Sequence, residues 1–183
     1  MAMKTRDRSL GDGVYFADSD YIGFSPRIMI LLVDSICVLA IWFLVAAAFA
    51  YFNLVGTYDR LLFTFIFAAT WFYLVPLKRS RFRTVGYKLV GAKLVTLRGE
   101  KPSLLMLTFR EMMWLFGPIG LIIDLVFCGI DSDSQTLRDR FTNMCLVKNS
   151  SQPIGRGEIH LAYTNMIGYS FALPRVSRIL AQR

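Results

Sequence analysis

The sequence predicts an all-α membrane protein with two transmembrane helices, a third, broken helical segment and a small two-stranded β element. Its 183 residues are 55% hydrophobic and only 19% charged, whereas an average soluble chain is about a quarter charged. Two apolar runs, 28–52 and 61–77, are long enough to cross a bilayer as helices. A third apolar run, 111–130, is interrupted at its centre by Gly117 and Pro118.

The first apolar run carries one charged residue, Asp34, and begins just after Arg27. A charge inside a bilayer costs roughly 3 kcal/mol or more, so it needs a partner or a function. Arg27 and Asp34 lie about two helical turns apart and therefore project from the same face of the helix. We expect this face of the first helix to be polar within the lipid.

The distribution of charge predicts the orientation of the helices. Basic residues crowd 78–110 against a single acid, Glu100, whereas the short loop 53–60 carries one charge of each sign. The positive-inside rule therefore places 78–110 and the N-terminus in the cytoplasm. A basic stretch directly after a helix favours anionic lipid headgroups as partners over nucleic acid. These basic residues are Lys78, Arg79, Arg81, Arg83, Lys88, Lys93, Arg98, Lys101 and Arg110.

Two alternatives exist for 111–130. If the segment spans the membrane, the residues from Asp131 onward lie outside, and if it turns back near Pro118 as a re-entrant hairpin, they stay in the cytoplasm. Basic residues stand on both sides of it, which favours the re-entrant form. They are Arg110 before the segment and Arg138, Arg140 and Lys148 after it.

A predicted strand pair supports the same topology. Residues 90–97 alternate in polarity, and a turn signal with Gly99 and Pro102 follows them. This pattern is typical of a short strand. The best partner is 143–148, because an isolated strand leaves its backbone groups unpaired. The stretch 84–93 is interpreted as a basic lead-in to this strand whose glycines permit close approach to the membrane surface or to another backbone.

The sequence offers little for catalysis or cofactor binding. Cys37, Cys128 and Cys145 are scattered and have neither disulfide-framework nor metal-ligand spacing. His160 is the sole histidine, so a histidine-paired nucleophile would have to be built on the C-terminal tail. The glycines of 84–93 lack the ending of a phosphate-binding loop. We therefore expect no enzyme, no cofactor and no metal site.

Several of these residues, taken together, resemble a known family. Arg27 and Asp34 in the first helix, the stretch 84–95, Arg110, and the motif 135–140 with Asp139 follow one another in the order and spacing of the RDD family of small bacterial integral membrane proteins. The resemblance covers about 22–148 and implies a multi-pass protein of the bacterial inner membrane. It makes Arg27 the family's arginine, and Asp34 and Asp139 its two aspartates.

The resulting division of the chain is a polar N-terminal segment, 1–24, an RDD-type membrane domain, 25–148, and a C-terminal tail, 149–183. The tail has no counterpart in the family core and is either an extra strand pair or a docking segment. Its role is not assigned.

Two functions are consistent with these features. In the first, the protein is a structural or accessory subunit of a larger membrane complex, and its buried charges form an ion-pair network. In the second, which the resemblance implies for some relatives, it is a small transporter or cation/proton antiporter that works as an oligomer through membrane-embedded aspartates. Two or three helices are too few to surround a transport pathway, which favours the role of a structural or accessory subunit. The candidate ion-pair or ligand residues are Arg27, Asp34, Arg110, Asp124 and Asp139.

The expected partners are other membrane subunits or further copies of the chain. The second apolar run carries more aromatic surface than so few helices can cover among themselves, so it faces lipid or a partner. These residues are Phe63, Phe65, Phe67, Trp71 and Phe72.

Overall fold

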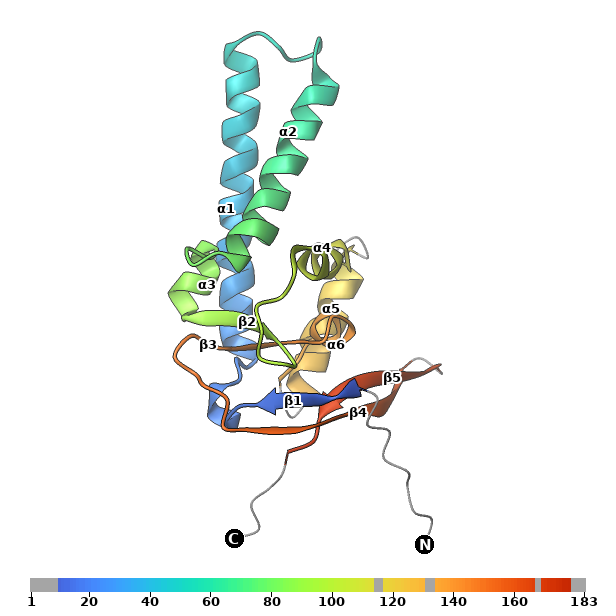
Figure 1. Ribbon diagram of the computed structural model, residues 1–183. Helices are drawn as coiled ribbons and strands as arrows, with labels where there is room; N and C mark the ends of the chain where they lie inside the picture. Colours follow the sequence, from blue (N-terminus) through green and yellow to red (C-terminus); the bar gives the residue numbers. More distant parts are fainter. Residues whose placement is uncertain (1–9, 114–116, 131–133, 167–168, 179–183) are drawn as a thin grey trace, which may run out of the picture.

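A long helical hairpin rises from a base of short helices and two antiparallel sheets (Figure 1). The computed structural model describes residues 10–113, 117–130, 134–166 and 169–178. The hairpin consists of α1, Phe24–Tyr51, and α2, Asp59–Phe72, and α2 continues into a π-helical turn, Tyr73–Leu77. Both described ends of the chain lie at the base, away from the tip of the hairpin.

The two predicted spans are confirmed as helices long and apolar enough to cross a membrane, Phe24–Tyr51 and Asp59–Leu77. Only 11% of the apolar window of each helix is buried within the protein, which distinguishes them from core helices of a soluble domain. At the tip, α1 ends where Asn53 adopts a positive φ of 55°, a usual way to stop a helix. The carboxylate of Asp59 then accepts a hydrogen bond from the backbone N–H of Gly56, at 2.7 Å.

The third segment contains two described helices and begins earlier in the chain than predicted. It starts with α4, Leu104–Met112, whose first turn is capped by the Ser103 hydroxyl, and resumes with α5, Gly117–Ile130. The break expected at Gly117 and Pro118 is wrong in position, because these residues lie at the start of a helix. Gly117 has a positive φ of 66°, a conformation that glycine adopts without steric cost. Arg110 therefore lies in the last turn of α4 instead of opening the third segment.

The predicted strand pair is confirmed. β2, Ala92–Thr96, pairs with β3, Met144–Lys148, in antiparallel register from Ala92 opposite Lys148 to Thr96 opposite Met144. Between them the chain runs through α4, α5 and α6, Leu137–Phe141. The pairing thus brings the two ends of the third segment together at the base of the hairpin.

The lead-in to the strand is helical, because residues 85–90 form a helix, α3, Val85–Val90. Gly91 ends this helix with a φ of 68° and leads directly into β2. The close approach expected of the glycines is found at Gly86. A Cβ atom there would lie 2.7 Å from the backbone oxygen of Ile30 in α1.

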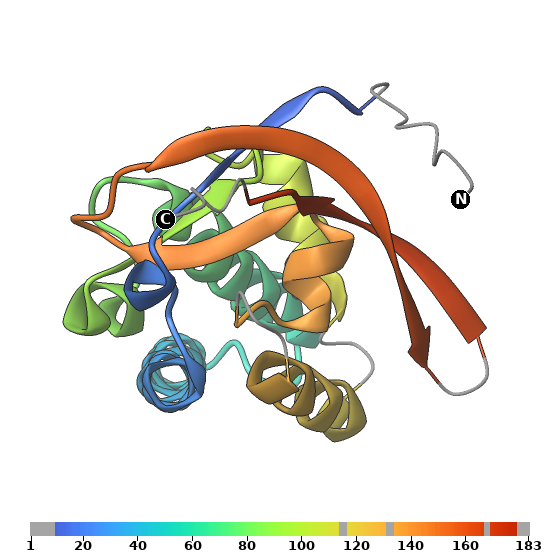
Figure 2. The ribbon, with the colours of Figure 1, turned by 90° about the horizontal axis from the view of Figure 1, so that it is seen from below.

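The all-α class is too narrow, because a second, three-stranded sheet crosses the base. Its strands are β1, Asp12–Tyr15, β4, Gly155–Met166, and β5, Tyr169–Val176, in the order β1-β4-β5. The tail therefore supplies an extra strand pair, and the N-terminal segment adds a third strand to it. Figure 2 shows β4 and β5 curving across the base, on the side away from α1 and α5.

The hydrophobic core lies on both faces of the β2–β3 pair. Leu94 and Leu146 face a cluster that includes Ile30 of α1 and Leu107 of α4. Val95 and Val147 point to the opposite face of the strand pair, where they pack in a second cluster with Phe16. This small core fixes α1, α4 and the N-terminal segment to one central ladder, and it positions the polar groups described next.

Candidate functional site

A buried charge cluster joins α1, α4 and α6 at the base of the hairpin, and Asp139 lies at its centre. Its carboxylate accepts a hydrogen bond from Nη1 of Arg27 at 2.7 Å and another from Nε of Arg110 at 2.9 Å. The Asp139 side chain is completely buried. Asp139 also forms a capping box with Thr136 at the start of α6. Contacts within α6 therefore help to orient the carboxylate toward the two arginines.

The cluster continues from Arg110 to the end of α2. Nη1 of Arg110 lies 3.0 Å from Oε1 of Glu111, and the same oxygen lies 2.6 Å from Nζ of Lys78. Arg27, Asp139, Arg110, Glu111 and Lys78 therefore form a chain of alternating charge. Because a buried charge without a counter-charge is costly, each member depends on its neighbours.

The electrostatics of the cluster hold its acids ionised. Burial by itself raises the pKa of the Asp139 carboxyl, but the Arg110 and Arg27 guanidinium groups outweigh burial and keep that pKa well below its usual range. Burial likewise raises the pKa of Glu111, and Lys78 and Arg110 lower it by more. Burial lowers the pKa of Arg110, but the Asp139 carboxylate and other nearby groups together raise it by more, so this guanidinium stays charged.

Asp34 lies apart from this cluster and is bound by uncharged donors. Its Oδ1 accepts hydrogen bonds from the Tyr73 hydroxyl at 2.9 Å and from the backbone N–H of Gly86 at 2.8 Å. Its Oδ2 accepts a third from the Thr84 hydroxyl at 2.8 Å. Arg27 projects from the same face of α1 but does not pair with Asp34, because its guanidinium donates to Asp139 and to the backbone oxygen of Ile22.

Asp124 forms a third polar contact, between α5 and α6. Its carboxylate accepts hydrogen bonds from the backbone N–H of Arg138 at 3.1 Å and from the Arg138 side chain. Asp124 is buried, whereas Ile122 and Val126 on the same helix are exposed. α5 therefore turns its acidic residue toward the protein and its apolar residues outward.

Of the candidate residues, the structure brings together Arg27, Arg110 and Asp139, and it separates Asp34 and Asp124 from them. The sequence did not identify Glu111 as a member of the cluster, although its position next to Arg110 was a signal. It also missed Tyr73 and Thr84 as donors to Asp34, because no local pattern links them to α1.

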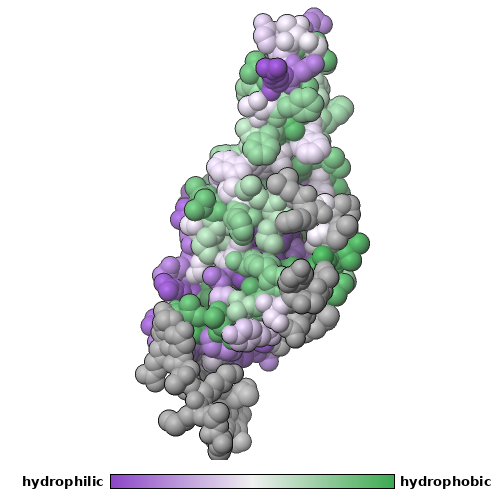
Figure 3. Space-filling view, turned by 90° about the vertical axis from the view of Figure 1, so that its right-hand side faces the viewer, coloured by the Kyte–Doolittle hydropathy of each residue, from purple (hydrophilic) through white to green (hydrophobic). Residues whose placement is uncertain are grey.

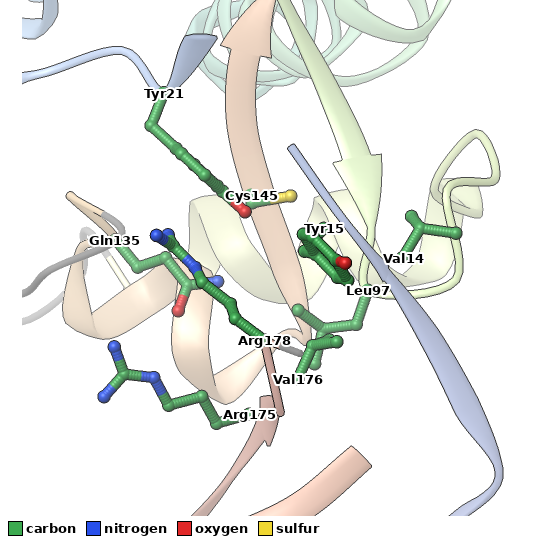
Figure 4. Close-up of a pocket in the computed structure, with 9 residues that line it drawn as sticks. All are labelled: Val14, Tyr15, Tyr21, Leu97, Gln135, Cys145, Arg175, Val176 and Arg178. Atoms are coloured by element: carbon green, nitrogen blue, oxygen red, sulfur yellow. The ribbon is translucent and has the colours of Figure 1, made fainter. Parts of the chain in front are cut away.

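No group of three or more His, Cys, Asp or Glu side chains in the described ranges is arranged to hold a metal ion. A small pocket lies between β1, β3 and the end of β5, where Tyr15, Tyr21, Gln135 and Arg178 are among its lining residues (Figure 4). None of the candidate residues lines this pocket.

A helical hairpin of membrane-crossing length above a small base with buried charges defines a membrane-associated class of protein. The chain belongs to the RDD family, whose model matches residues 21–143. No curated protein and no solved structure matches the chain. The match includes the charge cluster and Asp34 but ends before β3, so β3, β4 and β5 lie outside it.

Proposed function

We propose that this protein is an integral subunit of the bacterial inner membrane and acts as a structural or accessory component of a larger membrane complex. α1 and α2 cross the bilayer, and the base lies in the cytoplasm together with the residues before α1. The excess of basic residues in 78–110 supports this orientation. The proposal assigns no catalytic step to the chain.

The observation that carries the proposal is that donors of the protein itself bind the carboxylate oxygens of Asp34 and Asp139. Both carboxylate oxygens of Asp34 accept hydrogen bonds from fixed donors, and both oxygens of Asp139 are bound by arginines. A carboxylate that exchanges a proton for a cation needs free coordination and an aqueous path. Groups fully bound within the fold instead specify how the helices pack.

The exposed aromatic side chains of α2 are evidence for a partner protein within the membrane. Phe63 and Phe67, one helical turn apart, are exposed, and so are Phe65 and Phe72 on the other side of the helix. Apolar side chains cover much of the hairpin on the side seen in Figure 3. Large aromatic side chains are favoured at protein interfaces because they bury much area at low entropic cost. We assign the partner to the face that carries Phe63 and Phe67.

The experiment is affinity capture of the full chain into lipid nanodiscs, followed by native mass measurement. We expect a stoichiometric complex with a different membrane protein, which the double variant Phe63→Ala and Phe67→Ala loses. The matched control is Phe43→Ala with Leu39→Ala on the exposed side of α1, which is expected to retain the complex. A homo-oligomer without any other subunit would overturn the proposal and favour the antiporter alternative.

A further inference from the structure

Two short helices flank the lower end of α2 and turn apolar side chains outward. On α4, Leu105, Phe109 and Met112 are exposed, whereas Leu107 and Arg110 are buried. This polarity is the reverse of a helix on a soluble protein, whose charged residues face water. The cationic side chain of α4, Arg110, is therefore buried, and the outward face of the helix is apolar.

The second of these helices, α3, also exposes apolar side chains, and here an exposed cation, Lys88, lies among them. Val85 and Leu89, one helical turn apart, are exposed, and Phe82 just before the helix is 65% exposed. On the inward side, Gly86 packs against α1 and Tyr87 is buried. We call the exposed residues of the two helices the apolar collar: Phe82, Val85, Leu89, Leu105, Phe109 and Met112.

Side-chain contacts hold both helices at the depth where α2 ends (Figure 1). The indole N–H of Trp71 in α2 donates to the Thr108 hydroxyl of α4 at 3.0 Å. The backbone N–H of Val85 in α3 donates to the hydroxyl of Tyr73, in the turn that follows α2, at 3.1 Å. The collar therefore lies level with the last turns of this helix.

The length of the second helix places a membrane boundary at this level. The helix from Asp59 to Leu77 has 19 residues, or about 28 Å at 1.5 Å per residue. This length matches the hydrocarbon thickness of a bilayer, about 30 Å. A bilayer crossed by the hairpin consequently ends at the collar.

The charge at the collar is complementary to lipid phosphates. Arg79, Arg81 and Lys88 are exposed beside the residues of α3, and the chain contains no acidic residue between Asp59 and Glu100. The guanidinium of Arg81 lies 5.3 Å from the ring centre of Phe82. A cation next to an aromatic ring at a membrane surface suits the boundary between headgroup and acyl chain.

We propose that the apolar collar inserts into the cytoplasmic leaflet and that Arg79, Arg81 and Lys88 bind the phosphates of anionic phospholipids there. The proposal rests on the membrane insertion of the hairpin, proposed above, and adds a second attachment. The base is then held flat against the membrane by α3 and α4, which fixes the orientation that the base presents to a partner subunit.

Depth measurements with attached fluorophores test the apolar part. Single cysteines replace Leu44 in α1, Phe82 and Leu105 in the collar, and Ile154 before β4, in a Cys37→Ala background where Cys128 and Cys145 are buried. Leu44, Phe82 and Ile154 are 66%, 65% and 64% exposed, which makes them matched sites. Lipid-attached nitroxides and aqueous iodide are the two quenchers.

We expect the lipid nitroxide to quench the probes at Leu44, Phe82 and Leu105, and iodide alone to quench the probe at Ile154. Quenching at Leu44 combined with iodide quenching at Phe82 and Leu105 would overturn the collar while leaving the hairpin in the membrane. Iodide quenching at Leu44 as well would overturn membrane insertion itself. Protection of Phe82 and Leu105 from both quenchers would show that a protein covers the collar, and would also overturn the inference.

Lipid selectivity tests the basic part. The chain is reconstituted into nanodiscs of phosphatidylcholine with phosphatidylglycerol, and the lipids retained on extraction are quantified. Each Lys or Arg near an anionic surface is worth about a fivefold factor in binding. Three such factors multiply to about a hundredfold, so the triple variant Arg79→Gln, Arg81→Gln, Lys88→Gln should lose most of the preference for phosphatidylglycerol.

The control variant removes the same charge from exposed residues elsewhere on the base, Arg98→Gln, Lys101→Gln and Arg156→Gln. It should keep the preference for phosphatidylglycerol. If both triple variants lost the preference for phosphatidylglycerol equally, the preference would depend on net charge alone. This result would contradict a lipid site at the collar.

Discussion

Nη1 of Arg27 lies 2.7 Å from Oδ2 of Asp139, and the two residues are 112 positions apart in the chain. Both side chains are buried. This ion pair links the start of the first membrane-length helix to the short helix that follows the broken segment. Since Arg110 binds the other oxygen of the same carboxylate, one acid holds three helices in a fixed arrangement.

Replacing the central acid is expected to destabilise the whole base. Asp139→Asn keeps the size of the side chain but leaves Arg27 buried without its counter-charge and Arg110 with Glu111 alone. Breaking a buried ion pair in this way costs about 3–5 kcal/mol. Thermal unfolding in detergent should show a markedly lower Tm for Asp139→Asn than for the control Asp12→Asn, which alters an exposed acid. Equal Tm values would show that the cluster does not hold the base together.

The same acid predicts how stability depends on pH. The pKa of Asp139 is lowered in the folded state, so the unfolded chain binds more protons under acidic conditions. Its contribution is therefore complete above the unfolded aspartate pKa of about 3.9 and is lost as the pH falls below that value. The Tm of the wild type should fall toward that of Asp139→Asn between about pH 5 and pH 3. A gap in Tm that stays constant over this range would contradict the assignment.

Gly86 should be intolerant of even one added methyl group. A Cβ atom at this position would lie 2.7 Å from the Ile30 oxygen and 2.9 Å from Oδ1 of Asp34. Gly86→Ala then forces α3 away from α1, at a cost of about 1–3 kcal/mol. In Gly129→Ala the new Cβ meets nothing within 4 Å, and alanine favours the helix by up to about 1 kcal/mol. Unfolding free energies that rank the two variants in the opposite order would refute the close packing.

The three donors around Asp34 predict different results for two substitutions. Asp34→Ala leaves the Tyr73 hydroxyl, the Thr84 hydroxyl and the Gly86 N–H without their acceptor, at about 1–3 kcal/mol for each buried group. Asp34→Asn keeps one oxygen and should cost only about 1 kcal/mol. Denaturation in detergent should therefore rank the wild type and Asp34→Asn well above Asp34→Ala. Similar losses in both variants would imply that the negative charge itself is required.

Much of the helical framework was predictable because it depends on local properties of the chain. The two apolar runs and the alternation within 92–96 are each visible within one short window, whereas the break predicted at Gly117 and Pro118 falls within the start of α5. For the tail the sequence left open a strand pair or a docking segment, and the structure has the strand pair, in which Ile159, Leu161 and Tyr163 alternate as expected of a strand. The addition of β4 to a strand of the N-terminal segment was not predicted. This strand, β1, lies more than a hundred residues away along the chain, and no short window contains both.

The candidate site shows the same division between local and distant information. Helical periodicity correctly placed Arg27 and Asp34 on one buried face of α1, but it did not reveal their partners. Arg27 meets α6, whereas Asp34, about two turns further along, meets α3. The partners depend on how the later segments fold back onto α1, and that follows from core packing around β2 and β3.

The central claim is that the buried acids hold the fold together and do not carry ions. The most direct test is proton-coupled cation flux into liposomes that contain the purified chain, comparing the wild type with Asp34→Asn. We predict that neither protein raises the flux above that of empty liposomes. Flux by the wild type that Asp34→Asn abolishes, with an unchanged Tm, would contradict the account and assign ion transport to Asp34.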